Sequence, residues 1–252
     1  MAIDELLMSD PSPVLRFYGW ENPTLSFGRN HMKLNSIDRQ YCAQNKIELV
    51  RRITGGRTVL HHHEITYTFS VDARLFPQGV LAAYKLVSQA LLEGLETLGI
   101  HAAMTPSKKQ GTSSTICFEE SSAYELVADT RKLVGSAQYR TKNRILQHGS
   151  ILLDIDWNLW KRIWNISPGS IPLQQRVTSI KEQLGNIPPR QSFVTAISQS
   201  FSRFFQAPLR EMELDSWNWN EVNDLAANKY LIRNELQESI YHKERCSGVP
   251  PL

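Results

Sequence analysis

A cysteine and a lysine stand where they could perform nucleophilic chemistry. Cys117 lies where a strand-like run gives way to the polar turn Glu119-Glu120-Ser121, a position that suits an accessible thiol, although a cysteine in a core would be inert. Lys132 heads a later strand-like run whose alternation directs its side chain into a sheet. A buried lysine needs an anionic partner or a neutral state, and a thiolate could be that partner, because a nearby ammonium lowers the pKa of a thiol. The pair predicts covalent catalysis.

Two further regions could approach a ligand closely. Arg51-Arg52-Ile-Thr-Gly55-Gly56 places two glycines beside arginines, which exposes backbone N–H groups and planar donors for an anion, although an ordinary turn with solvated arginines explains it equally well. Gly135 and Gly149 lie inside strand-like runs, where glycine often marks the close approach of a ligand.

Three adjacent histidines, His61-His62-His63, do not favour a metal site. Successive residues of a strand point to opposite faces, so at most two of these imidazoles could share an ion, and further ligands are not evident nearby. One inward histidine with two solvated neighbours is the preferred interpretation.

The elements that must position these residues indicate an α+β fold. Residues 13–20 and 24–27 read as a hairpin or two adjacent strands, and Ser36 as the cap of a helix over 37–45. Residues 80–98 have helical spacing and end before Gly99. Further strands are expected at 48–53, 65–71, 112–118, 124–128, 132–138 and 147–155, and further helices at 158–164, 177–184, 192–205 and about 220–242. We expect a mixed β-sheet with the flanking helices gathered on one side and a helical tail.

Length, charge and cysteine content exclude several classes of protein. The 252 residues carry 28 Lys plus Arg against 25 Asp plus Glu, a net charge of +3 that is too small and dispersed to predict nucleic-acid or membrane binding. Three cysteines cannot all pair, and no signal peptide is evident, so a cytoplasmic location is expected. Pro188-Pro189 is the best linker, which divides the chain into a catalytic domain, 1–187, and a C-terminal helical extension, 190–252.

Four segments in order carry a family resemblance: RRITGGRTVLHH, CFEESSAYEL, RKLVGSAQ and LQHGSILL. Together they resemble the lipoate ligase and octanoyltransferase family, and within it the cysteine-dependent octanoyl-[acyl-carrier-protein]:protein N-octanoyltransferases. The resemblance extends from Met1 to about Leu236. It implies the catalytic-domain fold of biotin and lipoate protein ligases, an octanoyl-acyl carrier protein donor, a lipoyl-domain acceptor such as the glycine cleavage H protein, and no cofactor or metal.

The resemblance also assigns roles to individual residues. Cys117 matches the nucleophile that holds the acyl thioester, and Lys132 matches the lysine that lowers the pKa of that cysteine. The residues that match the acyl-binding segments are Arg52, Gly55, Gly56, His61, Gly135, Ser136, Gln138, His148 and Gly149. His62 stands where the family commonly has an acidic residue, and members usually carry a further stretch before Met1, so the sheet is expected to lack their first strand.

Three other functions remain open at this point. An ATP-dependent lipoate-protein ligase shares the Gly-Gly and Gly-Ser-Ala segments but would not need Cys117. An amidotransferase that moves octanoyl between lipoyl domains uses a similar cysteine but usually lacks the Gln-His-Gly-Ser element. A non-catalytic homologue would use the same pocket for binding alone.

Overall fold

The computed structural model of the chain describes residues 1–30, 34–105, 124–164, 172–212 and 217–232. Six strands form an antiparallel sheet in the order β1-β5-β9-β8-β7-β6, and three form a second sheet in the order β3-β2-β4. The strands are β1 (Val14–Tyr18), β2 (Thr24–Phe27), β3 (Glu48–Arg51), β4 (Val59–His61), β5 (Glu64–Asp72), β6 (Ala103–Met104), β7 (Leu126–Ala128), β8 (Arg131–Arg140) and β9 (Arg144–Leu152).

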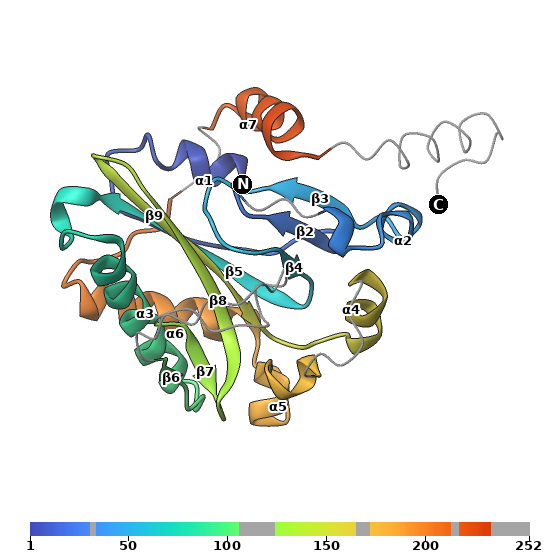
Figure 1. The fold of residues 1–252 in the computed structure, drawn as a ribbon. Helices are drawn as coiled ribbons and strands as arrows, with labels where there is room; N and C mark the ends of the chain where they lie inside the picture. Colours follow the sequence, from blue (N-terminus) through green and yellow to red (C-terminus); the bar gives the residue numbers. More distant parts are fainter. Residues whose placement is uncertain (31–33, 106–123, 165–171, 213–216, 233–252) are drawn as a thin grey trace.

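The helices lie on both sides of the six-stranded sheet (Figure 1). They are α1 (Ala2–Leu6), α2 (Arg39–Gln44), α3 (Val80–Glu96), α4 (Trp157–Ile163), α5 (Ile180–Leu184), α6 (Arg190–Phe204) and α7 (Trp219–Leu225), with 3-10 turns at Leu34–Ser36, Ala73–Leu75 and Leu173–Gln175. Helices α3 and α6 pack against one face, where Tyr67 and Phe69 of β5 meet Leu91 of α3 and Phe201 of α6.

The second sheet lies with α1 on the side of β5 and β9 away from α3 (Figure 1). Strand β2 pairs parallel with β3 and antiparallel with β4, which makes this small sheet mixed. Its apolar residues form a second core with α2 and α4 that includes Phe27, Cys42 and Trp160. Nearly all of β5 and all of β9 are buried, because both faces of these strands are covered. The predicted mixed sheet with flanking helices is confirmed, but the expectation that the helices gather on one side is wrong.

Two local predictions near the start of the chain are also wrong. Strands β1 and β2 are not paired with each other: β1 pairs with β5, and β2 joins the small sheet after the break at Asn22-Pro23. Helix α2 begins at Arg39 and is capped by Asp38, whose carboxylate accepts a hydrogen bond from the Tyr41 N–H at 2.8 Å. Ser36 lies in the preceding 3-10 turn instead. A carboxylate nearer the helix start displaces the serine as the cap.

The long helix expected over 220–242 ends much earlier. Helix α7 stops at Leu225, one π-helical turn follows over Ala226–Tyr230, and Leu231 then bridges to Val50 of β3. The Ile232 N–H donates to the Leu49 carbonyl at 2.8 Å, so the chain completes an edge of the small sheet and cannot continue as helix there. The predicted strand at 112–118 lies outside the described residues.

Helix α6 begins directly after Pro188-Pro189 and packs into the main core. Its Phe193, Ile197 and Phe201 are buried against the same cluster as α3, and Ser200 donates to the Ala90 carbonyl at 2.6 Å. The division into 1–187 and 190–252 stays a prediction about folding units, and α6 is the helix on which it can be tested.

Candidate functional site

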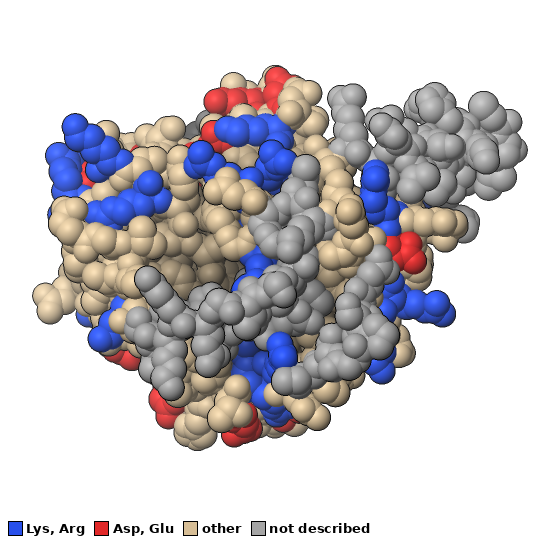
Figure 2. All heavy atoms as spheres, viewed as in Figure 1, with Lys and Arg blue, Asp and Glu red and all other residues tan. Residues whose placement is uncertain are grey.

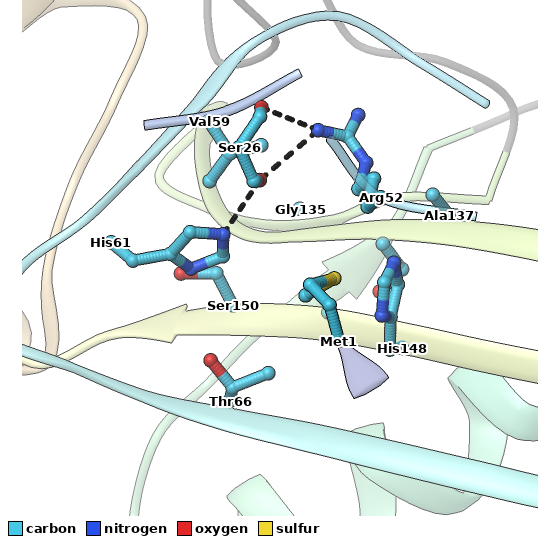
Figure 3. A pocket seen from close by; sticks show the side chains of 12 residues that line it. Met1, Ser26, Arg52, Val59, His61, Thr66, Gly135, Ala137, His148 and Ser150 are labelled. Carbon is cyan, nitrogen blue, oxygen red and sulfur yellow. Dashed lines mark hydrogen bonds between the residues drawn. The ribbon is translucent and has the colours of Figure 1, made fainter. Parts of the chain in front are cut away.

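A pocket, whose empty space together with the solvent at its mouth is about 330 Å³, lies where the small sheet faces β8 and β9 (Figure 3). Its walls come from segments far apart in the sequence. They are formed by Met1, Ser26, Arg52, Val59, His61, Thr66, Gly135, Ser136, Ala137, His148, Gly149 and Ser150. Most of the residues expected to bind the acyl group therefore surround one cavity. Gly55, Gly56 and Gln138 do not line it, and the side-chain amide of Gln138 instead lies 3.0 Å from that of Gln147.

The Arg52 guanidinium holds the Gly-Gly turn against β2. It donates to the Ser26 carbonyl at 2.7 Å, to the Ser26 hydroxyl at 3.1 Å and to the Gly55 carbonyl at 2.9 Å. Gly56 has φ +91°, and a Cβ on Gly28 would lie 1.9 Å from the Gly56 carbonyl oxygen, so the turn needs glycine on both sides of this contact. Arg52, which is only 3% exposed, thus shapes the pocket wall as well as lining it.

His61 is held at one wall by a hydrogen bond to Ser26 and by a stacked indole. Its Nε2 lies 2.7 Å from the Ser26 hydroxyl, and its Nδ1 lies 3.1 Å from the Glu64 carboxylate (Figure 3 shows the Ser26 contact). Trp20 stacks on the imidazole with ring centroids 4.3 Å apart and donates from its indole to Thr66 at 2.9 Å. The Ser26 hydroxyl and the stacked indole fix the ring, whereas its Nδ1 makes no hydrogen bond among the described residues.

His148, at the opposite wall, makes hydrogen bonds through both ring nitrogens. Its Nε2 lies 2.7 Å from the Thr54 hydroxyl and its Nδ1 lies 3.3 Å from the Asp4 carboxylate. Burial lowers the pKa of His148, although Asp4 acts in the opposite direction. Burial alone would raise the pKa of Asp4, but the N-terminal amine, His148 and Arg16 hold it well below its usual range. Tyr18 also donates to Asp4, at 2.9 Å.

Strands β8 and β9 pair side by side at the pocket and leave no room there for a larger side chain. Ser136 pairs with Gly149, and the Ser136 hydroxyl turns to the Tyr67 hydroxyl at 2.8 Å. A Cβ on Gly149 would lie 2.5 Å from the Ser136 Oγ and 2.7 Å from the Gly135 carbonyl oxygen. Glycine at 149 is therefore required by packing, which is one reason for a glycine inside a strand.

Lys132 enters the sheet as expected and is only 1% exposed. Its ammonium Nζ lies 2.6 Å from a carboxylate oxygen of Glu125, which is 2% exposed. The sequence suggested a thiolate as the anionic partner, and the partner that the structure describes is this carboxylate.

Of the three cysteines, Cys42 lies within the residues that the structure describes. Cys117 lies in 106–123 and Cys246 in 233–252, both outside the described residues, so the predicted roles of Cys117 stay predictions. Cys42 is buried in the second core, where burial and then Asp38 raise the pKa of its thiol to about 12. Such a thiol is protonated at neutral pH and is a poor nucleophile.

Sequence reasoning missed the partners of the two histidines. Ser26, Thr54, Glu64 and Asp4 come from four separate segments, and only the folded sheets bring them to His61 and His148. The expected strand at 24–27 included Ser26, but Glu64 lay just before the expected strand at 65–71, and neither pattern carried a signal for these contacts. His61 is the inward histidine of its triplet: it is 5% exposed, whereas His63 is exposed.

The remaining surface and the described side chains add three observations. Figure 2 shows Lys and Arg in several separate groups on this face, with Asp and Glu near some of them, which agrees with the dispersed charge of the sequence. Among the residues that the structure describes, no cluster of three or more His, Cys, Asp or Glu side chains could hold a metal ion. Within the same part of the chain, no helix is long and apolar enough to cross a bilayer.

Comparison with known proteins gives one consistent set of relatives. The family described as the lipoyl protein ligase A/B catalytic domain matches residues 1–202. Octanoyltransferase LipM of Symbiobacterium thermophilum is 35% identical over 91% of this chain and 90% of its own. Octanoyltransferase LipM of Brevibacillus brevis is 35% identical over 92% of this chain and 90% of its own.

Solved structures show the same fold at low identity. A lipoate-protein ligase A bound with ATP has a TM-score of 0.74 at 19% identity, covering 90% of this chain and 88% of its own. The bi-partite lipoate protein ligase from Thermoplasma acidophilum has a TM-score of 0.74 at 18% identity, covering 90% of this chain and 86% of its own.

Proposed function

The chain belongs to the lipoyl protein ligase A/B catalytic-domain family, and from this premise we propose that it transfers octanoyl through a thioester on Cys117 to a lysine of a lipoyl domain. It is an octanoyltransferase of protein lipoylation. Relatives that match nine tenths of both chains are named octanoyltransferases, whereas the ligases that share its fold match below 25% identity. The observation that carries the proposal is this identity along the whole catalytic region, with the acyl-binding segments of the sequence meeting at one pocket.

The first step moves the acyl group without ATP. The Cys117 thiolate attacks the thioester carbonyl of octanoyl-acyl carrier protein; a C–S bond to the enzyme forms and the C–S bond to the carrier breaks. The departing carrier thiolate takes up a proton. Because one thioester replaces another, the exchange is nearly balanced in energy. Lys132 would favour the thiolate through its positive charge.

The second step is strongly downhill because an amide replaces a thioester. The neutral amine of the acceptor lysine attacks the acyl carbonyl, the C–N bond forms, the C–S bond breaks, and one amine proton passes to the departing sulfur. An oxyanion develops in both steps, and backbone N–H groups beside the glycines could stabilise it. The glycine cleavage H protein is the acceptor that the resemblance suggests.

The pocket would bind the octanoyl chain. At about 0.8 kcal/mol for each buried CH₂, every methylene changes binding about fourfold, which is enough to select chain length. Val59, Ala137 and the glycines of β8 and β9 supply the apolar wall.

Intact-protein mass tests the proposal directly. We expect an octanoyl adduct after incubation with octanoyl-acyl carrier protein in the absence of ATP, released by hydroxylamine and mapped to Cys117. Cys117→Ala should abolish both the adduct and transfer to a lipoyl domain. If Cys117→Ala transfers normally, the thioester proposal fails. If transfer instead requires free octanoate, ATP and magnesium, the protein is a ligase.

A further inference from the structure

We propose that Glu125 is a positioning residue for acyl transfer, which keeps Lys132 charged and aims its ammonium. The inference rests on the proposed function, in which Lys132 serves the nucleophilic thiol. It is carried by the buried ion pair between the Lys132 Nζ and the Glu125 carboxylate, 2.6 Å apart.

The backbone fixes both residues of the pair. They flank the hairpin of β7 and β8, where Ala128 pairs with Arg131 and the turn residues Asp129 and Thr130 both have positive φ, 48° and 64°. Positive φ at both central residues matches the two-residue turn whose twist suits a hairpin. In this hairpin Lys132 pairs with Val127, and the register shifts between Leu126 and Val127, so the Glu125 carboxylate reaches the ammonium diagonally across the strands.

Main-chain groups of both residues also form hydrogen bonds to segments outside the hairpin. The Lys132 N–H donates to the Arg176 carbonyl at 2.7 Å, and the Thr178 N–H donates to the Lys132 carbonyl at 3.0 Å. The Glu125 N–H donates to the Thr105 hydroxyl at 3.0 Å. The backbone of neither residue can move far without breaking these bonds, and the 2.6 Å contact with Glu125 holds the lysine ammonium itself.

Burial makes the carboxylate decisive for the charge of the lysine. The side chains of Lys132 and Glu125 are 1% and 2% exposed, whereas Lys181 and its partner Asp154 are 55% and 31% exposed. An exposed lysine stays protonated without a partner, but a buried one tends to lose its proton. The Glu125 carboxylate thus keeps the Nζ of Lys132 protonated in a place where solvent cannot.

The proposal and a simple charge argument predict opposite effects on the reactivity of Cys117 when the Glu125 carboxylate is removed. If Lys132 stayed charged by itself, removing the Glu125 carboxylate would strengthen the positive field and make Cys117 more reactive. If Glu125 keeps the lysine charged, removing the Glu125 carboxylate leaves the lysine uncharged, and Cys117 becomes less reactive. The proposal requires the second outcome.

A double-mutant cycle on the full chain tests it. Variants Glu125→Gln, Lys132→Met and both together are treated with iodoacetamide across pH, and alkylation of Cys117 is followed by peptide mass together with the rate of octanoyl adduct formation. We expect each single variant to slow both reactions at least about tenfold at pH 7 and to move the alkylation profile to higher pH. The double variant should be no slower than either single variant, because the two residues act as one unit.

The control is Glu182→Gln, which removes the exposed ion pair of Arg131, the residue beside Lys132, and should alkylate as the wild type does. The proposal fails if Glu125→Gln alkylates as fast as the wild type or faster while Lys132→Met is slow. If Lys132→Met is itself normal, the role of the lysine in the proposed function fails instead. Should Glu125→Gln not fold, as judged by urea unfolding, Glu125→Asp replaces it: a slower reaction with a profile at higher pH supports the proposal, and an unchanged or faster one overturns it.

Discussion

Substitution of Gly149 by alanine probes how tightly β8 and β9 close the pocket wall. The new Cβ would lie 2.5 Å from the Ser136 Oγ, 2.7 Å from the Gly135 carbonyl oxygen and 2.7 Å from Cε1 of Tyr67. Two of these atoms belong to side chains held by their own hydrogen bond at 2.8 Å, and the third is main chain. No flexible side-chain end is available to yield, so the strands must separate.

The expected cost is a balance of two effects. Alanine in a strand is favoured over glycine by about 0.5–1 kcal/mol, while overpacking a filled site costs about 1–3 kcal/mol. With three contacts well inside van der Waals distance, the second effect dominates, and we expect a net loss of about 2 kcal/mol in the free energy of unfolding. With an m-value of about 3 kcal/mol/M, the urea midpoint falls by about 0.7 M.

Gly55→Ala is the matched control for urea unfolding followed by circular dichroism. No atom lies within 4 Å of a Cβ at position 55, so alanine fits there without strain. Its effect should be neutral or stabilising by up to about 1 kcal/mol. A Gly149→Ala protein as stable as the wild type would refute the reasoning, because the strands could then separate at no cost.

Three further predictions concern buried polar groups. Ser26→Ala leaves the His61 Nε2 without its partner at 2.7 Å and should cost about 1–3 kcal/mol in urea unfolding, whereas a neutral result would mean that the imidazole finds another partner. Since burial lowers the pKa of His148, the histidine of the unfolded chain takes up a proton first as pH falls below about 6.5, so the free energy of unfolding should decline from pH 6.5 to 5. His148→Gln should remove this part of the pH dependence, measured as urea midpoints. An unchanged pH dependence in the variant would mean that other groups cause it. With a thiol pKa of about 12, Cys42 should resist iodoacetamide at pH 8 in the folded protein and react in urea, and rapid labelling of the native protein would contradict its burial.

Local sequence patterns sufficed for the elements that their own residues determine. The alternation of residues 65–71 and the helical spacing of 80–98 predicted β5 and α3 closely, because apolar side chains gathered on one face of an element leave its period in the sequence. The inward direction of Lys132 followed from the same alternation, which did not say which of the three histidines points inward. The order of the four family segments indicated the family and its activity without any coordinates.

The tertiary structure alone decided which of these elements meet. Strand pairing depends on the whole chain, so β1 joins β5 rather than β2, and residues 231–232 leave helical geometry to bond to β3. The partners of the site residues follow the same logic: Glu125 reaches Lys132 diagonally across one hairpin, but Asp4 reaches His148 only because α1 packs over the sheet. Hydrogen bonds and ion pairs form between atoms within a few ångströms, and closeness in space between distant segments leaves no period or spacing in a single sequence.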